Sequence, residues 1–347
     1  MIRKSTIKID YANKGKLEKL DSLFEESKRV INLFINDLWE SENFFSKFVS
    51  FKQNTWLSAR LQQCLGKQAL EIVKSQRRKK KKTHPEFKRD CLNLDQRFVD
   101  VRFSLNTFDV WVKLSSIGNK VIVKLPGRRH KHLNNLLGSW NLSKSARLRK
   151  IGDHYYVDLY FEKEEPSKRE VGSDLGCDIG YKKLLAFSDG RQSSDFVQIY
   201  EKIARKKQKS KAFDRALVER NQLINREINS LDLSSVKSLI VEDLKNVKKR
   251  TKGRIRKQFM NKLQRWTYPK VLGKFAILCE EQGISLIKVN PAYTSQTCSG
   301  CGLVDKKSRN GEHFLCTGCG MAMDADLNAS INILHRGVYS PPAGSYP

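Results

Sequence analysis

The chain has 347 residues, of which 66 are Lys or Arg and 37 are Asp or Glu, giving a formal net charge of +29. Its length allows two or three domains with substantial cores. No apolar run approaches the roughly 18 residues of a membrane-spanning helix, which argues against an integral membrane protein. The excess positive charge predicts a polyanionic partner, nucleic acid, because the basic residues are not gathered on one membrane-binding amphipathic helix.

The N-terminus, MIRKSTIKIDY, lacks the apolar core of a secretory signal, so we expect a cytoplasmic protein that is nucleoid-associated when bound to DNA. Four of the eight cysteines form two Cys-x-x-Cys pairs. The others, Cys64, Cys91, Cys177 and Cys279, lie singly in apolar or helical stretches. A metal site with buried thiols is therefore expected in place of a disulfide framework.

The N-terminal half changes from helical periodicity to a period of two. The predicted elements are a strand over 4–10, helices over 16–49 and 54–80, a hairpin of 108–114 and 120–126, and a strand over 154–162. These favour a compact, barrel-like β module that is interrupted near its first strand by a helical insertion.

The pattern becomes α/β from Val171 onward. The predicted elements are strands over 176–180, 183–190, 195–200, 238–244 and 284–290, and helices over 198–229 and 259–281. Pro269 should either kink the second helix or mark its restart.

Three carboxylates occupy ends of these elements. Asp178 lies in GCDIG, Glu242 closes the apolar run Leu-Ile-Val, and Asp326 opens the predicted helix DLNASINIL. A buried strand does not normally end on an ionised acid unless a cation lies there. Two Mg²⁺ ions, with Mn²⁺ as an alternative, would supply that cation and stabilise the attacking and leaving oxygens at a phosphodiester. Carboxylates on the first strand, fourth strand and last helix favour an RNase H-like fold.

Each acid also has a simpler interpretation, as an ordinary strand-end residue or a helix N-cap. Asp324 competes with Asp326 for the third position, and two helical residues at this spacing would point about 200° apart. We favour Asp326, with Asp324 as the N-cap or as a residue outside the ligand set.

The spacing Cys-x2-Cys-x14-Cys-x2-Cys predicts one structural zinc ion. Its ligands would be Cys298, Cys301, Cys316 and Cys319. Glycines at 300, 302, 318 and 320 permit tight turns around the sulfurs. Four thiolates leave no open coordination position, so this zinc should not be catalytic. The intervening loop carries Lys306, Lys307, Arg309 and His313, which suits contact with phosphates.

Dense basic runs predict a groove that follows a phosphate backbone, although a solvated basic surface is the simpler interpretation of any single lysine. The segment 245–265 contains ten basic residues and no acid. Trp266 either stacks on a base or packs in a core. The candidate nucleic-acid contacts are Arg77, Arg78, Lys79, Lys80, Lys248, Lys249, Arg250, Arg254, Arg256, Lys306 and Lys307.

The C-terminal motifs follow in the order GCDIG and SDG, IVEDL, QRWTYPKVL, VNPAYTSQTCSGCG, and CGMAMDADLNASINIL. This order resembles TnpB, the RNA-guided nuclease family encoded by insertion sequences and ancestral to type V CRISPR effectors. The resemblance covers about 171–335, and the N-terminal half fits by architecture only. TnpB often has Asp-Arg-Asp at the last motif, whereas this chain has Asp324-Ala-Asp326, as many type V effectors do.

The resemblance implies a RuvC-like nuclease domain with an inserted zinc ribbon, preceded by a barrel-like wedge domain with a helical recognition insertion. Asp178, Glu242 and Asp326 would be its catalytic, magnesium-binding acids. The implied domains are a wedge (1–14 and 92–169), a recognition domain (15–91), a RuvC-like domain (170–290 and 323–347) and a zinc ribbon (291–322) that binds target nucleic acid.

The implied function is RNA-guided cleavage of double-stranded DNA beside a short flanking motif, with one active site and a structured guide RNA. We expect a monomer or weak dimer. Three alternatives stay open: a miniature type V CRISPR effector, a guide-directed DNA-binding protein with weak or no cleavage, and an RNA-independent RuvC-like nuclease or transposase. The presence of all three acids weighs against the second.

Overall fold

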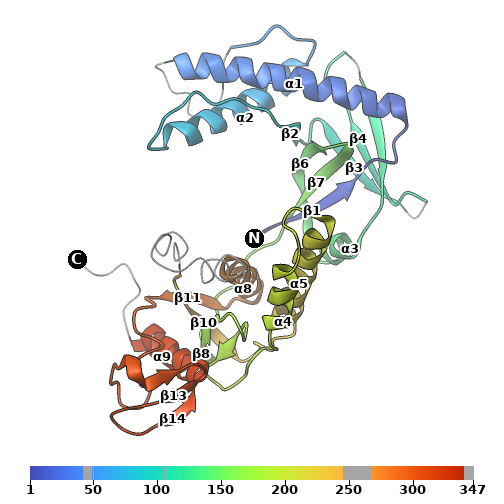
Figure 1. Cartoon of the computed structure of the whole chain (residues 1–347). Coiled ribbons are helices and arrows are strands. Elements are labelled where there is room, and N and C mark those ends of the chain that lie inside the picture. The colour runs from blue at the N-terminus through green and yellow to red at the C-terminus, as the bar shows by residue number, and fades with distance from the viewer. Residues whose placement is uncertain (42–48, 50, 105–106, 120, 245–266, 340–347) are drawn as a thin grey trace. The chain divides into compact units, whose positions relative to one another are not determined.

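The computed structural model describes residues 1–41, 49, 51–104, 107–119, 121–244 and 267–339. The chain divides into two compact units, residues 1–164 and 165–347, which are described separately. Both mix helices with sheets (Figure 1). None of the helices within the described ranges is long and apolar enough to span a membrane.

The first unit contains two antiparallel sheets, with strand orders β1-β7-β6-β2 and β3-β4-β5. Their strands are β1 (Ile2–Lys8), β2 (Cys91–Asp95), β3 (Val99–Phe103), β4 (Val110–Leu114), β5 (Val123–Gly127), β6 (Asn141–Ile151) and β7 (His154–Glu162). The predicted hairpin is confirmed as β4–β5, and the predicted strand over 154–162 is β7. Whether the two sheets amount to a barrel-like domain stays a prediction.

Helices α1 (Lys14–Glu40) and α2 (Ala59–Arg77) lie side by side in the same unit (Figure 1), and α3 (Lys131–Leu137) precedes β6. The side chain of Asn13 caps α1, and that of Ser58 caps α2, by accepting backbone N–H bonds. The apolar stripe of α1 is buried in the core, as its spacing predicts. However, α1 ends at Glu40, so the predicted extension to residue 49 is too long, and 42–48 lie outside the described residues.

The second unit is built on a sheet of order β11-β10-β8-β9. Strands β8, β10 and β11 run parallel, and β9 is antiparallel to β8. These strands are β8 (Ser173–Asp178), β9 (Ala186–Phe187), β10 (Val236–Glu242) and β11 (Ser285–Val289). Leu239, Ile240 and Val241 are all fully buried, which is the pattern of a parallel strand covered on both faces.

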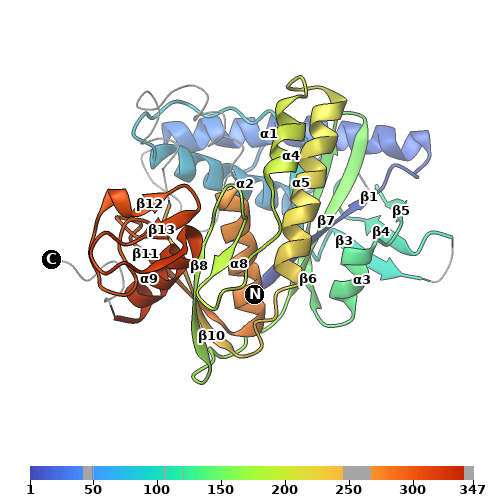
Figure 2. The ribbon, with the colours of Figure 1, turned by 60° about the horizontal axis from the view of Figure 1, so that its bottom comes forward.

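Four helices and a small sheet complete the part of this unit that the structure describes (Figure 2). They are α4 (Val197–Ala204), α5 (Lys211–Asn229), α8 (Tyr268–Gln282), α9 (Ala325–Tyr339), and strands β12 (Arg309–Asn310), β13 (His313–Leu315) and β14 (Ala322–Asp324), with a short 3-10 turn at Lys306–Ser308. Pro269 lies in the first turn of α8 and so marks the start of that helix. The predicted helical residues 259–266 lie outside the described part.

The predicted strand over 195–200 is wrong, because most of it forms α4. Phe196, Ile199, Tyr200 and Ile203 recur at helical spacing, and all four are buried. The Asp195 carboxylate accepts the backbone N–H of Val197 at 2.6 Å, which favours helix at this point. Consequently Glu242 ends the third strand of its sheet along the chain, where the sequence predicted the fourth, and the predicted helix over 198–229 is two helices.

Gly176 lets α9 approach β8 closely, because a Cβ atom there would lie 2.2 Å from the carbonyl oxygen of Ser330. We expect Gly176→Ala to destabilise the protein by about 1–3 kcal/mol, since helix and strand must separate to admit the methyl group. Gly273→Ala is the matched control, because no atom lies within 4 Å of a Cβ there and α8 should gain about 0.5–1 kcal/mol. Denaturant unfolding measures both, and equal stabilities would contradict the close packing.

Candidate functional site

Asp178, Glu242 and Asp326 form a cluster that we call the carboxylate centre. Asp178 ends β8, and Glu242 ends the adjacent parallel strand β10 at nearly the same level, because Cys177 pairs with Val241. Parallel strands present their carboxyl ends at one edge of a sheet, where such folds place ligands. Asp326 lies in the first turn of α9, which packs against β8. The structure thus brings together three residues that are far apart in the sequence.

The acids of the carboxylate centre disfavour ionisation of Asp178. Burial raises the pKa of Asp178 to about 8, with Glu242 and Asp326 adding repulsion and Arg309 opposing it. Burial also raises the pKa of Glu242, against a hydrogen bond that the Thr294 hydroxyl donates to its Oε1. Carboxylate oxygens from separate elements are the ligand type that Mg²⁺ prefers, so the chemistry of these residues suits the ion, and the magnesium site stays a prediction.

Arg309 is the site residue that the sequence analysis missed, having placed it only among phosphate contacts. Its Nη2 donates to Asp326 Oδ1 at 2.8 Å, from β12. The Asp326 side chain is 15% exposed, so the pair is largely shielded from water. The contact depends on how the small sheet folds back onto α9, and no local sequence pattern indicates it.

Asp324 is the N-cap of α9, one of the two roles predicted for it. Its Oδ1 accepts the backbone N–H groups of Asp326 and Leu327, each at 3.0 Å. Its Oδ2 pairs with the Lys183 ammonium at 2.9 Å. Asp324 ends β14 and is not helical, so the angular argument for separating it from Asp326 does not apply.

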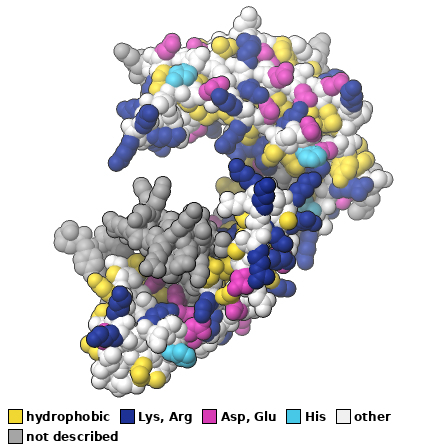
Figure 3. Space-filling view, viewed as in Figure 1, with side chains coloured by type: hydrophobic (Ala, Val, Ile, Leu, Met, Phe, Trp, Pro, Cys, Tyr) yellow, Lys and Arg dark blue, Asp and Glu magenta, His cyan; other side chains and the backbone are white. Residues whose placement is uncertain are grey.

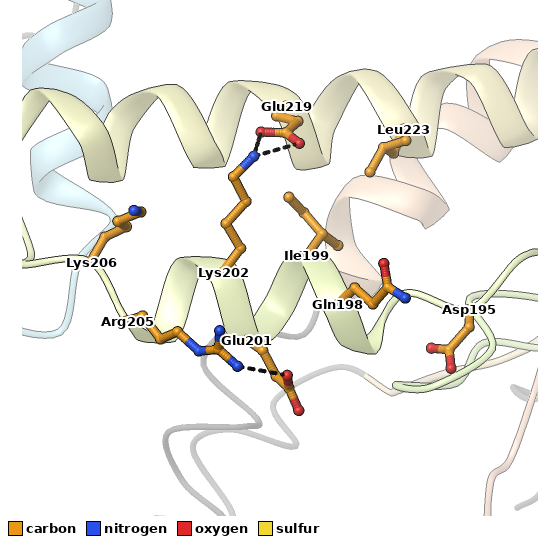
Figure 4. Close-up of a pocket in the computed structure, with 9 residues that line it drawn as sticks. All are labelled: Asp195, Gln198, Ile199, Glu201, Lys202, Arg205, Lys206, Glu219 and Leu223. Carbon is orange, nitrogen blue, oxygen red and sulfur yellow. Dashed lines mark hydrogen bonds and ion pairs between the residues drawn. The ribbon is translucent and has the colours of Figure 1, made fainter.

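A cavity of about 710 Å³ lies elsewhere, between α4 and α5, and contains none of the three carboxylates. Its lining is charged, with Lys202 paired to Glu219 and Arg205 paired to Glu201 (Figure 4). Since its polar side chains largely neutralise one another, we assign it no ligand.

The four cysteines of the paired motifs converge, with all four sulfurs within 4.8 Å of one another. Cys298 Sγ is 3.7 Å from Cys319 Sγ, and Cys301 Sγ is 3.6 Å from Cys316 Sγ. Four thiols at this separation fit a tetrahedral zinc ion. Backbone N–H groups of Cys319 and Gly318 point at Cys316 Sγ and lower the pKa of that thiol to about 6, which favours the thiolate that zinc requires.

The two cysteine turns repeat one backbone pattern. The N–H of Gly302 bonds to the carbonyl of Cys298 at 2.9 Å, and that of Gly320 bonds to Cys316 at 3.0 Å. Both glycines have positive φ values, 77° and 74°, as the tight-turn prediction requires. Gly300 and Gly318 contribute by leaving room, because a Cβ at either would lie within 3 Å of a neighbouring side chain.

Two buried asparagines of α9 hold the segment that leads into the first cysteine turn. Asn328 donates to the Thr297 carbonyl at 2.8 Å and accepts the N–H of Ser299 at 2.9 Å. Asn332 donates to the carbonyls of Thr297 and Thr294 at 2.7 and 3.0 Å. Both side chains are at least 94% buried. The helix that carries Asp326 is therefore fixed to the cysteine cluster.

The predicted nucleic-acid contacts differ in their surroundings. Arg78, Lys79, Lys80, Lys306 and Lys307 are exposed, on a surface where Lys and Arg are widespread (Figure 3).

Arg77 instead donates to the carbonyls of Leu38 and Trp39 at the end of α1 and stacks on Trp39, so it joins two helices. The remaining candidates, Lys248, Lys249, Arg250, Arg254 and Arg256, lie outside the described residues, as does Trp266.

Residues 270–333 match the family described as Cas12f1-like, TNB domain. The chain is 28% identical over 252 residues to a TnpB-like protein, aq_aa05, of Aquifex aeolicus, covering 58% of this chain and 81% of that protein. The chain belongs to the TnpB/Cas12f family. It is also 47% identical over 72 residues to the CRISPR-associated endodeoxyribonuclease Cas12f1 of Sulfoacidibacillus thermotolerans, covering 20% of this chain but only 17% of that nuclease.

The fold is similar over most of the chain to a solved member of the family. The cryo-EM structure of the Cas12f1–sgRNA–target DNA complex matches with a TM-score of 0.60 at 15% identity, covering 92% of this chain and 82% of that one. At this identity the match supports the fold alone. The two chains therefore share a mixed α/β architecture with several sheets.

We expect the purified protein to contain one zinc ion per chain, and Cys316→Ser to lower that content because three thiolates cannot complete the tetrahedral site. Cys279→Ser is the matched control, since Cys279 is as deeply buried in α8 but lies outside the cluster. Elemental analysis measures both. Full zinc content in Cys316→Ser would contradict the four-thiolate site.

The carboxylate centre also predicts a pH dependence for the metal-free protein. The folded-state pKa of Asp178, about 8, lies above its ordinary value of 3.8, so folding favours the protonated carboxyl. This stabilisation is complete below about pH 4 and is lost as the pH rises through about 8. Unfolding in EDTA should therefore show wild type becoming progressively less stable than Asp178→Asn as pH rises. A difference that stays constant with pH would refute the raised pKa.

Proposed function

We propose that the chain is an RNA-guided DNA endonuclease with a RuvC-like, RNase H-type active site. The observation that carries the proposal is the convergence of Asp178, Glu242 and Asp326 at one edge of a parallel sheet. This edge is joined to what we call the four-cysteine module, which consists of the four clustered cysteines and strands β12–β14. The relatives named above include an endodeoxyribonuclease and a TnpB-like protein, which supports this function.

Asp178, Glu242 and Asp326 would hold two Mg²⁺ ions, or Mn²⁺ in their place. Ions bound there would neutralise charge on the attacking and leaving oxygens of a phosphodiester. Thr294 orients Glu242 by donating to its Oε1, and Asp324 fixes the first turn of α9. Arg309, held at Asp326, places a guanidinium where it can meet the phosphate being cut.

The net charge of +29 supports binding of both a structured guide RNA and double-stranded DNA. Base pairing would supply sequence recognition, while the protein holds the backbone and reads a short flanking motif. The first unit would act as the wedge and helical recognition domains, and the four-cysteine module as a zinc ribbon that contacts target nucleic acid. We propose that the complex is a monomer or a weak dimer.

We expect Asp178→Ala and Glu242→Ala to abolish cleavage of a guide-matched DNA while leaving guide-dependent DNA binding nearly intact. Each variant would remove oxygen ligands of the metal ions but no contact to the nucleic-acid backbone. Cleavage gels and a binding assay on the same complex measure the two activities. Glu312→Gln is a suitable control, because this acid pairs with Lys182 at 2.6 Å in the same module but lies outside the carboxylate centre. Wild-type cleavage by either alanine variant would contradict the assignment.

Sequencing the RNA that co-purifies from cells carrying the native locus tests the guide. RNA from a transposon end would support a TnpB role, and processed CRISPR RNA would support a miniature type V effector. Absence of a defined RNA would contradict RNA guidance and favour an RNA-independent nuclease or transposase.

A further inference from the structure

The outer face of the β3–β4–β5 sheet in the first unit has features that folding does not explain. Along β4, Val110, Val112 and Leu114 are buried in the core, so the alternate residues Trp111 and Lys113 lie on the opposite face. Strand register aligns two rows across this outer face. One row is Arg102, Trp111 and Pro126, and the other is Asp100, Lys113 and Lys124.

Trp111 does not contribute to the hydrophobic core. The part of the chain that the structure describes contains four tryptophans, and Trp39, Trp56 and Trp140 all pack against the core, whereas Trp111 does not. Its ring meets Phe108 edge to face at 6.1 Å, and Phe108 lies 5.4 Å from Tyr11, which is 46% exposed. Phe108 and Trp111 are half-buried and Tyr11 is exposed, so the three rings form a run of partly accessible aromatic surface.

The charges around these rings are unbalanced. Lys113 lies directly opposite Lys124, an arrangement that costs stability in a sheet, and neither has an ion-pair partner within the described ranges. The exposed Arg128 guanidinium lies 5.2 Å from the Tyr11 ring and 5.8 Å from that of Phe108. Asp100 lies opposite Lys113 and accepts a hydrogen bond from Arg102, so the two rows set one carboxylate against three cations. A cavity of about 680 Å³, lined by both rows, lies over this face.

We propose that this aromatic–basic face (Tyr11, Phe108, Trp111, Lys113, Lys124 and Arg128) binds unpaired nucleotides of the guide RNA. Bases would stack on the aromatic rings, and the lysines and Arg128 would contact phosphates. A polyanion would relieve the repulsion between the two lysines, and bases would cover the accessible parts of the three rings. The choice of RNA rests on the proposed function.

RNA is favoured over DNA because, under the proposed function, the guide must stay bound while the chain finds and cuts its DNA target. A DNA strand must instead reach the carboxylate centre, which belongs to the second unit, and leave after cutting. A surface on the first unit that held the DNA strand by stacking would oppose that release.

Binding of a fluorescein-labelled oligouridine to the full chain, freed of co-purified nucleic acid, tests the proposal. Trp111→Ala should weaken binding roughly 5- to 150-fold through loss of stacking, and Trp111→Phe should retain most of the affinity. Trp140→Ala is the matched control and should bind like wild type, because Trp140 packs against the core and lies outside the aromatic–basic face, although Arg3 lies 5.3 Å from its ring. Wild type and Trp111→Ala should bind an abasic RNA with the same affinity, because it has no bases to stack on the ring.

A double variant, Lys113→Gln with Lys124→Gln, tests the phosphate contacts separately and leaves the aromatic rings in place. Its salt dependence for oligouridine should fall by about 1.4 in log–log slope, since each contact to a single strand contributes about 0.7. If circular dichroism shows that Trp111→Ala is unfolded, this double variant still tests whether the aromatic–basic face binds RNA. An unchanged slope would then overturn the proposal.

Other outcomes also overturn the proposal. Equal oligouridine affinity in wild type and folded Trp111→Ala would rule out base stacking on Trp111. The proposed nuclease function would not be affected by that result. A larger loss for an oligodeoxynucleotide than for oligouridine would reassign the face to DNA, and Trp111-dependent binding of polyglutamate at equal affinity would reassign it to an acidic protein segment. Failure of wild type to bind any RNA would overturn the proposed function as well.

Discussion

Repulsion among three carboxylates at the end of a parallel sheet is the constraint on which the rest of the second unit depends. β8 and β10 must be buried to form the sheet, yet each ends on an acid, and α9 brings a third acid against them. Arg309 compensates part of this charge by pairing with Asp326. Burial, with repulsion from the neighbouring acids, raises the pKa of Asp178, and cations bound as proposed at these carboxylates would offset that cost.

The four-cysteine module is connected to this centre by several independent contacts. Arg309 reaches Asp326 from β12, Asp324 caps α9 from the end of β14, and two buried asparagines of α9 hold the approach to Cys298. A zinc ion that fixes the cysteine turns would therefore also fix the helix that supplies the third carboxylate. A structural zinc ion at the four cysteines would thus support the carboxylate centre without taking part in the proposed chemistry.

Much of this organisation was predictable because it depends on local patterns. The cysteine spacing and the apolar runs that end on Asp178 and Glu242 indicate their structures directly, and the N-cap role of Asp324 follows from its place before a helix. The strand expected over 195–200 failed because a short apolar run fits both periods, and the buried Phe196, Ile199, Tyr200 and Ile203 follow the helical one. Arg309 and the buried asparagines could not be predicted, because their partners are set by tertiary packing.

The two kinds of surface in the chain place different demands on a nucleic acid. Isolated exposed lysines such as Lys79 and Lys306 are sufficient to attract a phosphate backbone of any sequence, and they cost the fold little because water solvates them. An aromatic ring withheld from the core, as Trp111 is, gives up burial that the first unit would otherwise use for stability. Such a cost is understandable only if the ring is covered in the working complex, and bases offer flat apolar faces that cover it. Charge would thus hold the nucleic acid, while the aromatic–basic face would fix the position of an unpaired segment against the first unit.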